Sequence, residues 1–400
     1  MPVCITAYTA TSALGAGKTA HTAAFNAHLS GLKPLASTEF CAASGASAPL
    51  NTWVGHVDGL HEPLPNHWAH WDCRNNRLAW LGLQGDGFAD SVRAAAQRHG
   101  AHRVAVVLGS STASIGATED AYRHLATNGV FPPQPNNPRL HTLHSLVAFV
   151  QEALGLTGPN LTVSTACSSS AKAFASGERL LALGLADAVV VGGVDTLCDS
   201  VLYGFNALQL VSPEPCRPFD EQRRGINLGE AAGFALLERG TEGLRLLGCG
   251  ESSDAHHVSA PQPEGLGANA ALDQALTRAG IGAAEVDYLH AHGTATPKND
   301  AVEAQVVAQR FQPRTLVSST KGHTGHTLGA AGALGAAFGL MAIETGCVPA
   351  TVGTREPERT IAPYLLLKPA RRDIRTAVCH AFGFGGSNSV LVFGRGDAVK

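Results

Sequence analysis

The sequence predicts an α/β protein built from alternating strands and helices. Short runs of apolar and β-branched residues, bounded by glycine, recur through the 400 residues, and segments of helical periodicity lie between them. This alternation is typical of βαβ units, whose largely parallel sheets are covered by helices on both faces. With 44% hydrophobic and 15% charged residues, the chain is long and apolar enough to bury a large core.

Each predicted element depends on one of two periodicities. Apolar runs predict strands at Val3–Tyr8, Arg103–Leu108, Ala188–Val191, Phe234–Leu237, Val286–His290, Leu316–Ser318, Thr376–His380 and Ser389–Phe393. Helical spacing predicts helices at about 74–98, 115–127, 142–154, 168–184, 267–279, 299–310 and 326–345. The segments Ser44–Pro65 and Phe131–Arg139 are predicted to be irregular.

The chain also shows signs of an internal duplication. In each part a strand leads into a turn with a reactive residue, Cys167 in the first and His326 in the second, and a long Ala/Gly-rich helix follows. Each part also has a Gly-Gly turn near its end. We therefore expect two halves, residues 1–243 and 244–400.

Composition excludes several classes of function. The formal net charge of −3 gives no electrostatic basis for binding nucleic acid or an anionic membrane. No secretory leader is evident after Met1, and the apolar stretch Leu328–Ile343 is too short to span a bilayer, so we expect no membrane span. The nine cysteines include no CxxC pair, which indicates reduced thiols and a cytoplasmic protein.

Cys167 is the one cysteine whose sequence context indicates reactivity. It lies in STACSSS (164–170), where an apolar run ends and an Ala-rich helix begins. The free N–H groups and the dipole at a helix start favour an anion, so we expect a lowered thiol pKa and a nucleophilic sulfur. The alternative is a buried cysteine that simply fits a tight turn.

Two histidine motifs lie far downstream of this cysteine. His292 in HGTAT follows an apolar strand, and His326 in KGHTGH begins a long Gly/Ala helix, five residues after Lys321. A lysine near two histidines would hold them neutral and donate hydrogen bonds to an acid or carbonyl oxygen. Asp300 and Glu303 fall at the start of a helix, where they either anchor the lysine or form a solvated face. Each histidine taken alone is equally consistent with a structural role.

A metal site is the competing interpretation of these motifs. His290 and His292 form an H-x-H pair, and His323 and His326 form an H-x-x-H pair, but the sequence has no H-E-x-x-H or CxxC signature. One cysteine with two separate histidines is more typical of a covalent thioester enzyme. We therefore predict no metal and no cofactor.

Six motifs in order resemble the β-ketoacyl-[acyl carrier protein] synthases, the elongating condensing enzymes of the thiolase fold. The motifs are STACSSS (164–170), RPFDEQRRGINLGEAAG (217–233), SSDAHHVSAP (252–261), HGTATPKND (292–300), SSTKGHTGHTLGAAGA (318–333) and FGFGGSN (382–388). They cover essentially the whole chain. The resemblance implies a duplicated, five-layer αβαβα fold with mixed sheets, and a dimer.

The resemblance also assigns roles to the matching residues. Cys167 would accept the acyl group, and His292 and His326 would bind the malonyl thioester and promote its decarboxylation. Lys321 would support that site. Asp300 and Glu303 would surround the lysine. Phe384 would act as the gate, and its N–H together with that of Cys167 would form the oxyanion hole. Thr112, Phe205 and Ser259 would line the acyl pocket, and Arg74 and Arg77 would face an acidic acyl carrier protein.

Three positions depart from the family pattern. Gly335 stands where relatives commonly have a glutamate paired with the lysine, and Gln209 where they often use an arginine for the carrier. Thr112 is smaller and more polar than the aliphatic residue of saturated-chain enzymes, which predicts a wider or differently shaped tunnel. The SSDAHHVSAP segment is more similar to ketosynthases of aryl polyene or xanthomonadin-type pigment clusters.

The predicted function is decarboxylative condensation of an acyl thioester on Cys167 with malonyl-carrier, giving a 3-oxoacyl-carrier in fatty acid or polyene elongation. The expected partner chain is a second copy or a ketosynthase homologue that acts as chain-length factor. The alternatives are a non-catalytic chain-length-factor-like subunit and a degradative thiolase. The first typically loses the cysteine, and the second needs another catalytic cysteine, which the Gly-rich loop near the C-terminus does not offer.

Overall fold

The structure is a computed structural model that describes residues 1–37, 50–132 and 138–396. Parts of both segments predicted to be irregular, and Cys41, lie outside these ranges. The strands are β1 (Val3–Ser12), β2 (Gly15–Ala16), β3 (Lys33–Pro34), β4 (Trp53–Gly55), β5 (Val104–Gly109), β6 (Asn160–Val163), β7 (Ala188–Asp195), β8 (Leu228–Gly229), β9 (Ala231–Arg239), β10 (Leu244–Ser253), β11 (Tyr288–His290), β12 (Leu316–Ser318), β13 (Cys347–Val348), β14 (Ala370–Arg371), β15 (Thr376–Gly383) and β16 (Ser387–Arg395).

The helices alternate with these strands, as predicted. They are α1 (Gly17–Asn26), α3 (Arg74–Gln84), α4 (Phe88–His99), α5 (Ile115–Asn128), α6 (Ser145–Ala153), α7 (Ser169–Ala182), α8 (Asp199–Ala207), α9 (Leu266–Ala279), α10 (Pro297–Arg310), α11 (Lys321–Thr324) and α12 (Ala331–Thr345). The helix predicted at 74–98 is two helices, because Asp86 and Gly87 adopt positive φ angles of 54° and 68° between them. The long strand β10 was not predicted.

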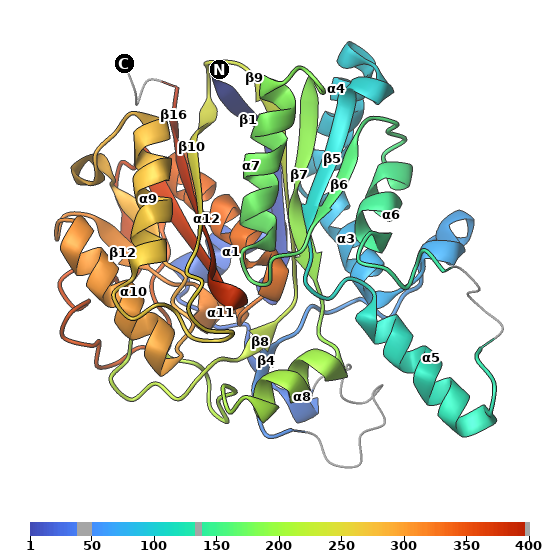
Figure 1. The fold of residues 1–400 in the computed structure, drawn as a ribbon, viewed down its shortest axis with the longest axis horizontal. Helices are drawn as coiled ribbons and strands as arrows, with labels where there is room; N and C mark the ends of the chain where they lie inside the picture. Colours follow the sequence, from blue (N-terminus) through green and yellow to red (C-terminus); the bar gives the residue numbers. More distant parts are fainter. Residues whose placement is uncertain (38–49, 133–137, 397–400) are drawn as a thin grey trace.

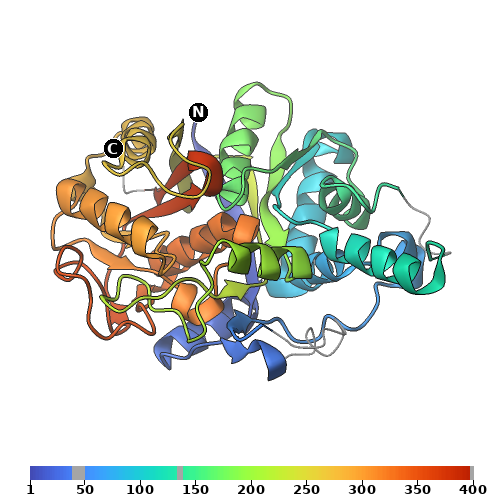
Figure 2. The same ribbon diagram turned by 60° about the horizontal axis from the view of Figure 1, so that its bottom comes forward.

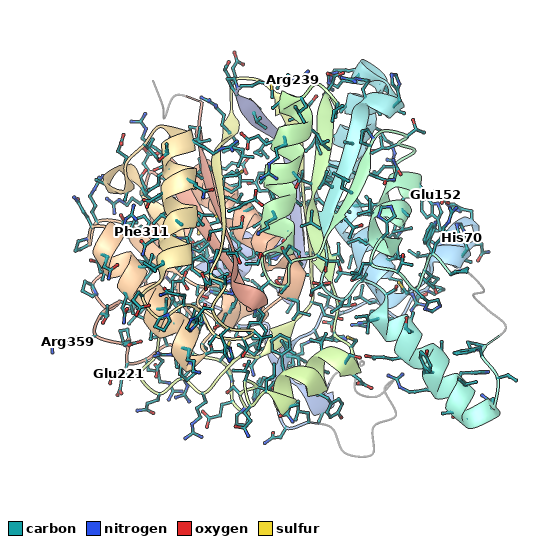
Figure 3. The ribbon with its side chains drawn as sticks, in the orientation of Figure 1. His70, Glu152, Glu221, Arg239, Phe311 and Arg359 are labelled. Carbon is teal, nitrogen blue, oxygen red and sulfur yellow. The ribbon has the colours of Figure 1, made fainter. Side chains whose placement is uncertain are left out.

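The strand order repeats along the main sheet. The order is β12-β11-β15-β16-β10-β1-β9-β7-β5-β6, with β2 paired to β1, and an antiparallel β1–β10 pair joins the two sides. Counted from the first strand of each side, both sides read 3-2-4-5-1. Each side mixes parallel and antiparallel pairs. The first side ends with β9 at Arg239 (Figure 3), and the second begins with β10 at Leu244; the division at 243/244 stays a prediction.

Alternate residues along the strands pack into different layers. In β5, Val104, Val106 and Leu108 contact the cluster under α3, α4 and α6, whereas Ala105 and Val107 face the cluster shared by α7 and α12. This is the two-residue period of a sheet that is covered on both faces. On the other side, α9 and α10 pack on the outer face of β11, β15 and β16. The layers are therefore helix, sheet, helix, sheet, helix, which confirms the predicted architecture (Figures 1 and 2).

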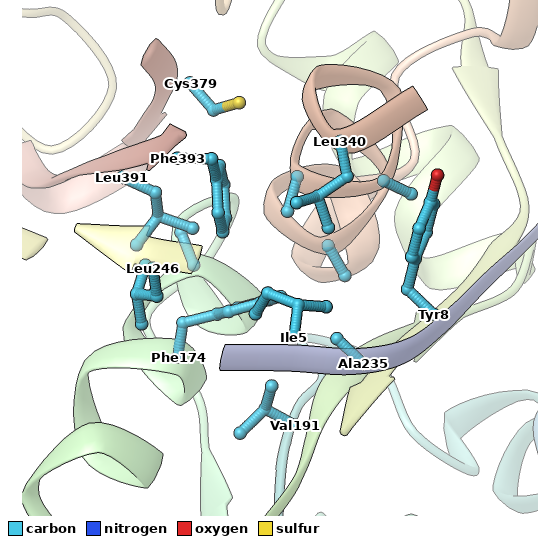
Figure 4. Packing of buried hydrophobic residues seen from close by; sticks show 14 of the residues in the cluster. Ile5, Tyr8, Phe174, Val191, Ala235, Leu246, Leu340, Cys379, Leu391 and Phe393 are labelled. Atoms are coloured by element: carbon cyan, nitrogen blue, oxygen red, sulfur yellow. The ribbon is translucent and has the colours of Figure 1, made fainter. Parts of the chain in front are cut away.

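The central helices α7 and α12 form the middle layer between the two sides of the sheet. Phe174, Leu340 and Phe393 meet in the core between them (Figure 4). A Cβ at position 332 would lie 2.5 Å from the backbone nitrogen of Ala171, so the two helices can pack this closely only because residue 332 is glycine. Within the described residues, one helix, 328–345, is long and apolar enough to cross a membrane, so the expectation that this stretch is too short is wrong, but 83% of it is buried inside the protein. It is the core helix of the fold, as expected from its small residues.

Candidate active site

A strained turn between β6 and α7 presents Cys167. Ala166 has a φ of +53°, an uncommon conformation for a residue with a side chain. Ser169 holds the turn, since its Oγ accepts from the Thr165 N–H at 2.8 Å and donates to the Ala166 carbonyl at 2.6 Å. Cys167 therefore lies two residues before the start of α7, at the strand-to-helix junction that the sequence predicted, and is 4% exposed.

Two buried carboxylates on α10 hold the loop that carries His292. Glu303 accepts from the backbone N–H groups of His292 and Gly293, both at 2.7 Å. Asp300 accepts from the N–H groups of Thr294 and Ala295 at 2.9 and 3.0 Å. Both carboxylates are at most 1% exposed, so the alternative of a solvated helix face is wrong. Burial raises the pKa of Asp300 to about 6.

The connection from β12 to α12 carries Lys321 and His326. The Lys321 Nζ donates to the carbonyl oxygen of His292 and so joins the two histidine-bearing loops. Burial lowers the pKa of Lys321, while the nearby Glu303 and Asp300 carboxylates act to raise it. His326 Nδ1 accepts from the Leu328 N–H at 3.2 Å, which assigns the ring proton to Nε2.

These turns bring the three predicted reactive groups together in one pocket. The sulfur of Cys167 and a ring nitrogen from each of His292 and His326 all lie within 4.8 Å of one another. The imidazole rings are nearly perpendicular, at 87°, with centroids 5.3 Å apart. The cavity beside them has a volume of about 350 Å³, and Phe205, Ser259 and Phe384 are among its lining residues.

Burial sets the charge state of all three groups. It lowers the pKa of both histidines well below the usual value, and the Lys321 ammonium lowers them further. Both imidazoles are therefore neutral near pH 7. Burial also raises the pKa of Cys167 to about 11, although Lys321 and the Phe384 N–H oppose the shift. The expectation of a lowered thiol pKa is wrong, because desolvation outweighs the helix start.

Phe384 lies at the mouth of this pocket. Its backbone N–H and that of Cys167 both act to lower the pKa of the Cys167 thiol, so two donors are directed toward the reacting atom. Its ring is 5.4 Å from the ring of Phe205 on α8. The Gly385 N–H donates to the carbonyl of Val258 at 2.8 Å and ties the Gly-rich loop to the segment of the SSDAHHVSAP motif.

The remaining predicted residues lie away from the cavity that contains Cys167. The Thr112 hydroxyl donates to Asp195 at 2.7 Å, and Thr112 is not among the residues that line this cavity. Arg74 pairs with Glu230 at 2.6 Å, and Arg77 pairs with Asp72 at 2.6 Å. Both arginines line a different cavity, of about 920 Å³, between α3 and α5. Carrier binding by these arginines stays a prediction.

Two supporting residues were missed by the sequence reasoning. Asp195, at the end of β7, is fully buried and accepts from the N–H groups of Ser111 and Thr112 and from Gly329 N–H in the other half. The Nδ1–H of His380 donates to the Glu303 carboxylate at 2.9 Å, and the His380 ring lies 6.5 Å from the ring of Phe311. A charged residue that ends an otherwise apolar strand was the signal available for Asp195.

The same three reactive side chains meet the simplest distance requirement for a metal ion. Zinc is usually held by four ligands, or by three and a water. Lys321 opposes a bound cation, because its ammonium is close enough to lower the pKa of both histidines. The acyl-transfer interpretation needs no further ligand and uses the neutral imidazoles as they stand.

Family models match most of the chain. "Beta-ketoacyl synthase, N-terminal domain" matches residues 79–243, and "Beta-ketoacyl synthase, C-terminal domain" matches residues 245–355. Nodulation protein E of Rhizobium meliloti (strain 1021) is 37% identical over 307 residues, which are 73% of this chain and 75% of that protein. 3-Oxoacyl-[acyl-carrier-protein] synthase 2 of Vibrio cholerae is 33% identical over 316 residues, 74% of this chain and 76% of that protein.

Solved structures share the whole fold. A chain in the structure of the ketosynthase ApeO in complex with its chain length factor ApeC, from Xenorhabdus doucetiae, superposes with a TM-score of 0.88 at 35% identity. The match covers 98% of each chain. A β-ketoacyl synthase from Burkholderia phymatum matches with a TM-score of 0.86 at 26% identity, over 98% of this chain and 99% of that one.

Proposed function

This chain belongs to the β-ketoacyl synthase family, and we propose that Cys167 accepts the acyl group in its reaction while His292 and His326 bind the extender thioester. The chain is an acyltransferase that carries out decarboxylative Claisen condensation in chain elongation. The observation that carries the residue assignment is the mutual approach of one sulfur and two ring nitrogens within 4.8 Å in a buried pocket.

The first half-reaction loads the acyl group. Because burial keeps Cys167 as a thiol, its proton must leave as the sulfur attacks the carbonyl carbon of the incoming thioester. The neutral imidazole of His292 is close enough to accept that proton and to pass it to the leaving carrier sulfur, since His326 already holds its proton on Nε2 and accepts the Leu328 N–H at Nδ1. The N–H groups of Cys167 and Phe384 stabilise the developing oxyanion, and the carrier thiol leaves.

The second half-reaction forms the carbon–carbon bond. The malonyl thioester carbonyl accepts hydrogen bonds from His292 and His326, so CO₂ can leave and its bonding electrons form an enolate. Neutral imidazoles suit this step because each can donate a ring N–H to the enolate oxygen as negative charge develops on it. The enolate carbon then attacks the acyl carbonyl on Cys167, the carbon–sulfur bond breaks, and the thiolate regains a proton.

Intact-mass analysis with defined acyl-carrier thioesters tests this assignment. We expect one acyl group on the wild-type chain and none on Cys167→Ala, and loss of condensation by at least about 10³-fold in that variant. Cys216→Ala is a matched control, because Cys216 is also buried, its thiol donates to the Lys321 carbonyl at 3.2 Å, and it is not among the residues that line the cavity beside Cys167. Full elongation activity in Cys167→Ala would refute the assignment.

Two alternatives are less well supported. A chain-length-factor-like subunit would not need the sulfur and both imidazoles in one pocket. A degradative thiolase needs a second reactive cysteine, and Cys379 is buried on β15 with its thiol on the Gly335 carbonyl at 3.2 Å. Loading by malonyl-carrier rather than acetyl-CoA would separate the thiolase from the proposed enzyme.

The partner that we propose is a second chain of the same fold, either another copy or a chain-length-factor homologue. Large apolar side chains are exposed at Tyr122 (60%) and Phe131 (54%), whose rings are 5.5 Å apart, and at Leu161 (44%). Leu161 lies on β6, the strand that ends the described sheet. An exposed apolar edge of this kind is typical of an interface. Mass photometry after co-expression with a homologue would show which pair forms.

The pathway is proposed from the SSDAHHVSAP segment (252–261), which favours polyene-type elongation over housekeeping fatty acid elongation. An acyl carrier protein is the proposed donor. The compartment proposed is the cytoplasm, which is consistent with eight described cysteines that are all free. Residues 1–243 and 244–400 are proposed as the two thiolase-like halves, and the two family models meet at this point.

A further inference from the structure

A buried histidine outside the reacting pair links the two histidine-bearing loops. His290 ends β11, two residues before His292, and is 4% exposed. Its Nε2 is 2.9 Å from the Oγ1 of Thr320, the residue before Lys321 and the N-terminal flank of α11. The other ring nitrogen, Nδ1, has no hydrogen-bond partner although it is buried. A buried polar atom without a partner carries a free-energy cost, so its placement needs a reason.

Gly335 on α12 supplies the space that this ring occupies. A Cβ at Gly335 would lie 2.9 Å from Nδ1 and 3.2 Å from Cε1 of His290. Side-chain carbons do not approach a neighbour this closely, so any larger residue would push the ring away from Thr320. His290 and Gly335 are therefore a matched pair.

The His290 ring also lies near the buried Lys321 ammonium group and is itself uncharged. Burial and the nearby Lys321 lower the pKa of His290 to about 3, so the imidazole is neutral. The charged or titratable groups that act on Lys321 are Glu303, Cys167, Asp300 and Cys216. The lysine's position among them depends on the start of α11, to which His290 is bonded through Thr320.

We propose that His290 is a positioning residue: through the Thr320 hydroxyl it fixes Lys321 relative to Cys167 and His292, and Gly335 is the space that allows it. The inference builds on the proposed function, in which Cys167 is the acyl acceptor. Lys321 lowers the energy of the Cys167 thiolate, so displacing the lysine reduces the thiolate fraction.

The test measures how fast iodoacetamide alkylates Cys167 at several pH values, with the modified residue identified by mass spectrometry. We expect alkylation at pH 8 to slow by about three- to tenfold in His290→Leu and Thr320→Val, because a shift of one pKa unit changes the thiolate fraction tenfold. His290→Gln, which keeps a hydrogen-bonding group near the Nε2 position, should restore most of the rate. Condensation should lose kcat with little change in KM for the acyl carrier.

Glycine substitutions on α12 distinguish this role from simple packing. Gly335→Ala should slow alkylation as His290→Leu does, and the double variant should be no slower than His290→Leu alone. Gly339→Ala on the same helix is the matched control, since its Cβ would lie 2.9 Å from the sulfur of Cys379 on β15. It should lower stability without changing the alkylation rate.

The outcomes are separable. If Thr320→Val and His290→Leu are folded and alkylate like wild type, the positioning role is wrong and His290 is only packing. If His290→Leu does not fold, Thr320→Val and His290→Gln decide. A wild-type Cys167 that alkylates but is never acylated would contradict the proposed function instead, and would leave the effect of His290 on the sulfur to be read independently.

Discussion

The turns that lead into the two central helices occupy the same place in the repeated strand order, yet they are built differently. β6 reaches α7 through residues 164–168, a short turn with a strained Ala166 and hydroxyl side chains. β12 reaches α12 through residues 319–330, a longer connection that contains α11, the buried Lys321 and His326. The first turn contains no charged side chain, and the second contains a buried ammonium group.

The loops after β5 and β11 show the same contrast. Each is held by a buried carboxylate that accepts backbone N–H groups, Asp195 in the first half and Glu303 in the second. Only the second loop carries a catalytic candidate, His292. The comparison indicates that one half fixes the position of the sulfur through backbone geometry, while the other supplies donors and charge.

Removing one imidazole should have the largest effect after removal of the sulfur. We expect His292→Ala and His326→Ala to slow malonyl decarboxylation by about 10²- to 10³-fold, because each removes one donor to the enolate oxygen. Acyl loading on Cys167 should fall much less in His326→Ala, because that variant keeps the His292 imidazole as acceptor of the thiol proton. CO₂ release and intact acyl-enzyme mass, measured on the same samples, separate the two steps. Equal losses of decarboxylation and of acyl loading in His326→Ala would mean that the halves are not divided in function as proposed.

Neutralising the two buried carboxylates, Asp195 and Glu303, should change the reactivity of the Cys167 sulfur in opposite directions. Asp195→Asn removes a charge that raises the pKa of Cys167, whereas Glu303→Gln removes a charge that raises the pKa of Lys321 and so weakens the lysine's support of the thiolate. We expect alkylation of Cys167 to be about two- to fivefold faster in the first and slower in the second.

Stability provides the control for this pair. Each substitution leaves buried backbone N–H groups without a good hydrogen-bond acceptor. The free energy of unfolding of each variant, measured by urea denaturation, should therefore fall by about 2–4 kcal/mol. Similar losses of stability with opposite changes in reactivity would show that the carboxylates act on the site through charge. Changes of the same sign in both would show that they act only through structure.

Acid should destabilise the second half more than the first. Buried histidines with a lowered pKa are His290, His292, His323 and His326 in the second half and His21 in the first. Below about pH 6.5 the unfolded chain binds protons that these folded imidazoles do not, so stability present above that pH is lost as pH falls. Each proton contributes about 1.4 kcal/mol per pH unit.

Asp300 works in the opposite direction over part of this range. Its folded pKa of about 6 lies above the usual value, so between about pH 6 and 4 the folded state holds a proton that the unfolded state has lost. Because this single carboxyl group stabilises the fold at low pH while five histidines destabilise it, the net effect of acid is a loss of stability. Urea denaturation at pH 7.5, 6 and 5 should show this, and His290→Gln should reduce the slope by about one proton. A slope unchanged in His290→Gln would mean that His290 does not stay neutral.

The sequence was sufficient for the parts of the site that follow strand ends. Cys167, His292 and His326 could be found because each lies where an apolar run gives way to small polar residues, and parallel strand ends meet at one edge. The charge state of the sulfur could not be predicted, since burial depends on residues from both halves. The contact between His290 and Gly335 joins segments that are far apart in the chain, and no local pattern marks it. For Asp195, the local sequence shows only a charged residue at the end of an apolar strand, not its contacts with the other half.

Metal analysis is expected to show the smallest effect, and it bears directly on the division between the halves. If the second half supplies neutral donors, purified protein should contain no stoichiometric zinc, and a chelator should leave condensation unchanged. The physical reason is Lys321, whose buried ammonium lies close enough to depress both imidazoles and would repel a divalent cation placed between them. A Lys321→Met variant is the informative partner, because it removes that repulsion. Zinc bound at one equivalent by the wild type, and lost in His292→Ala, would mean that sulfur and imidazoles are ligands and that the proposed acyl transfer is wrong.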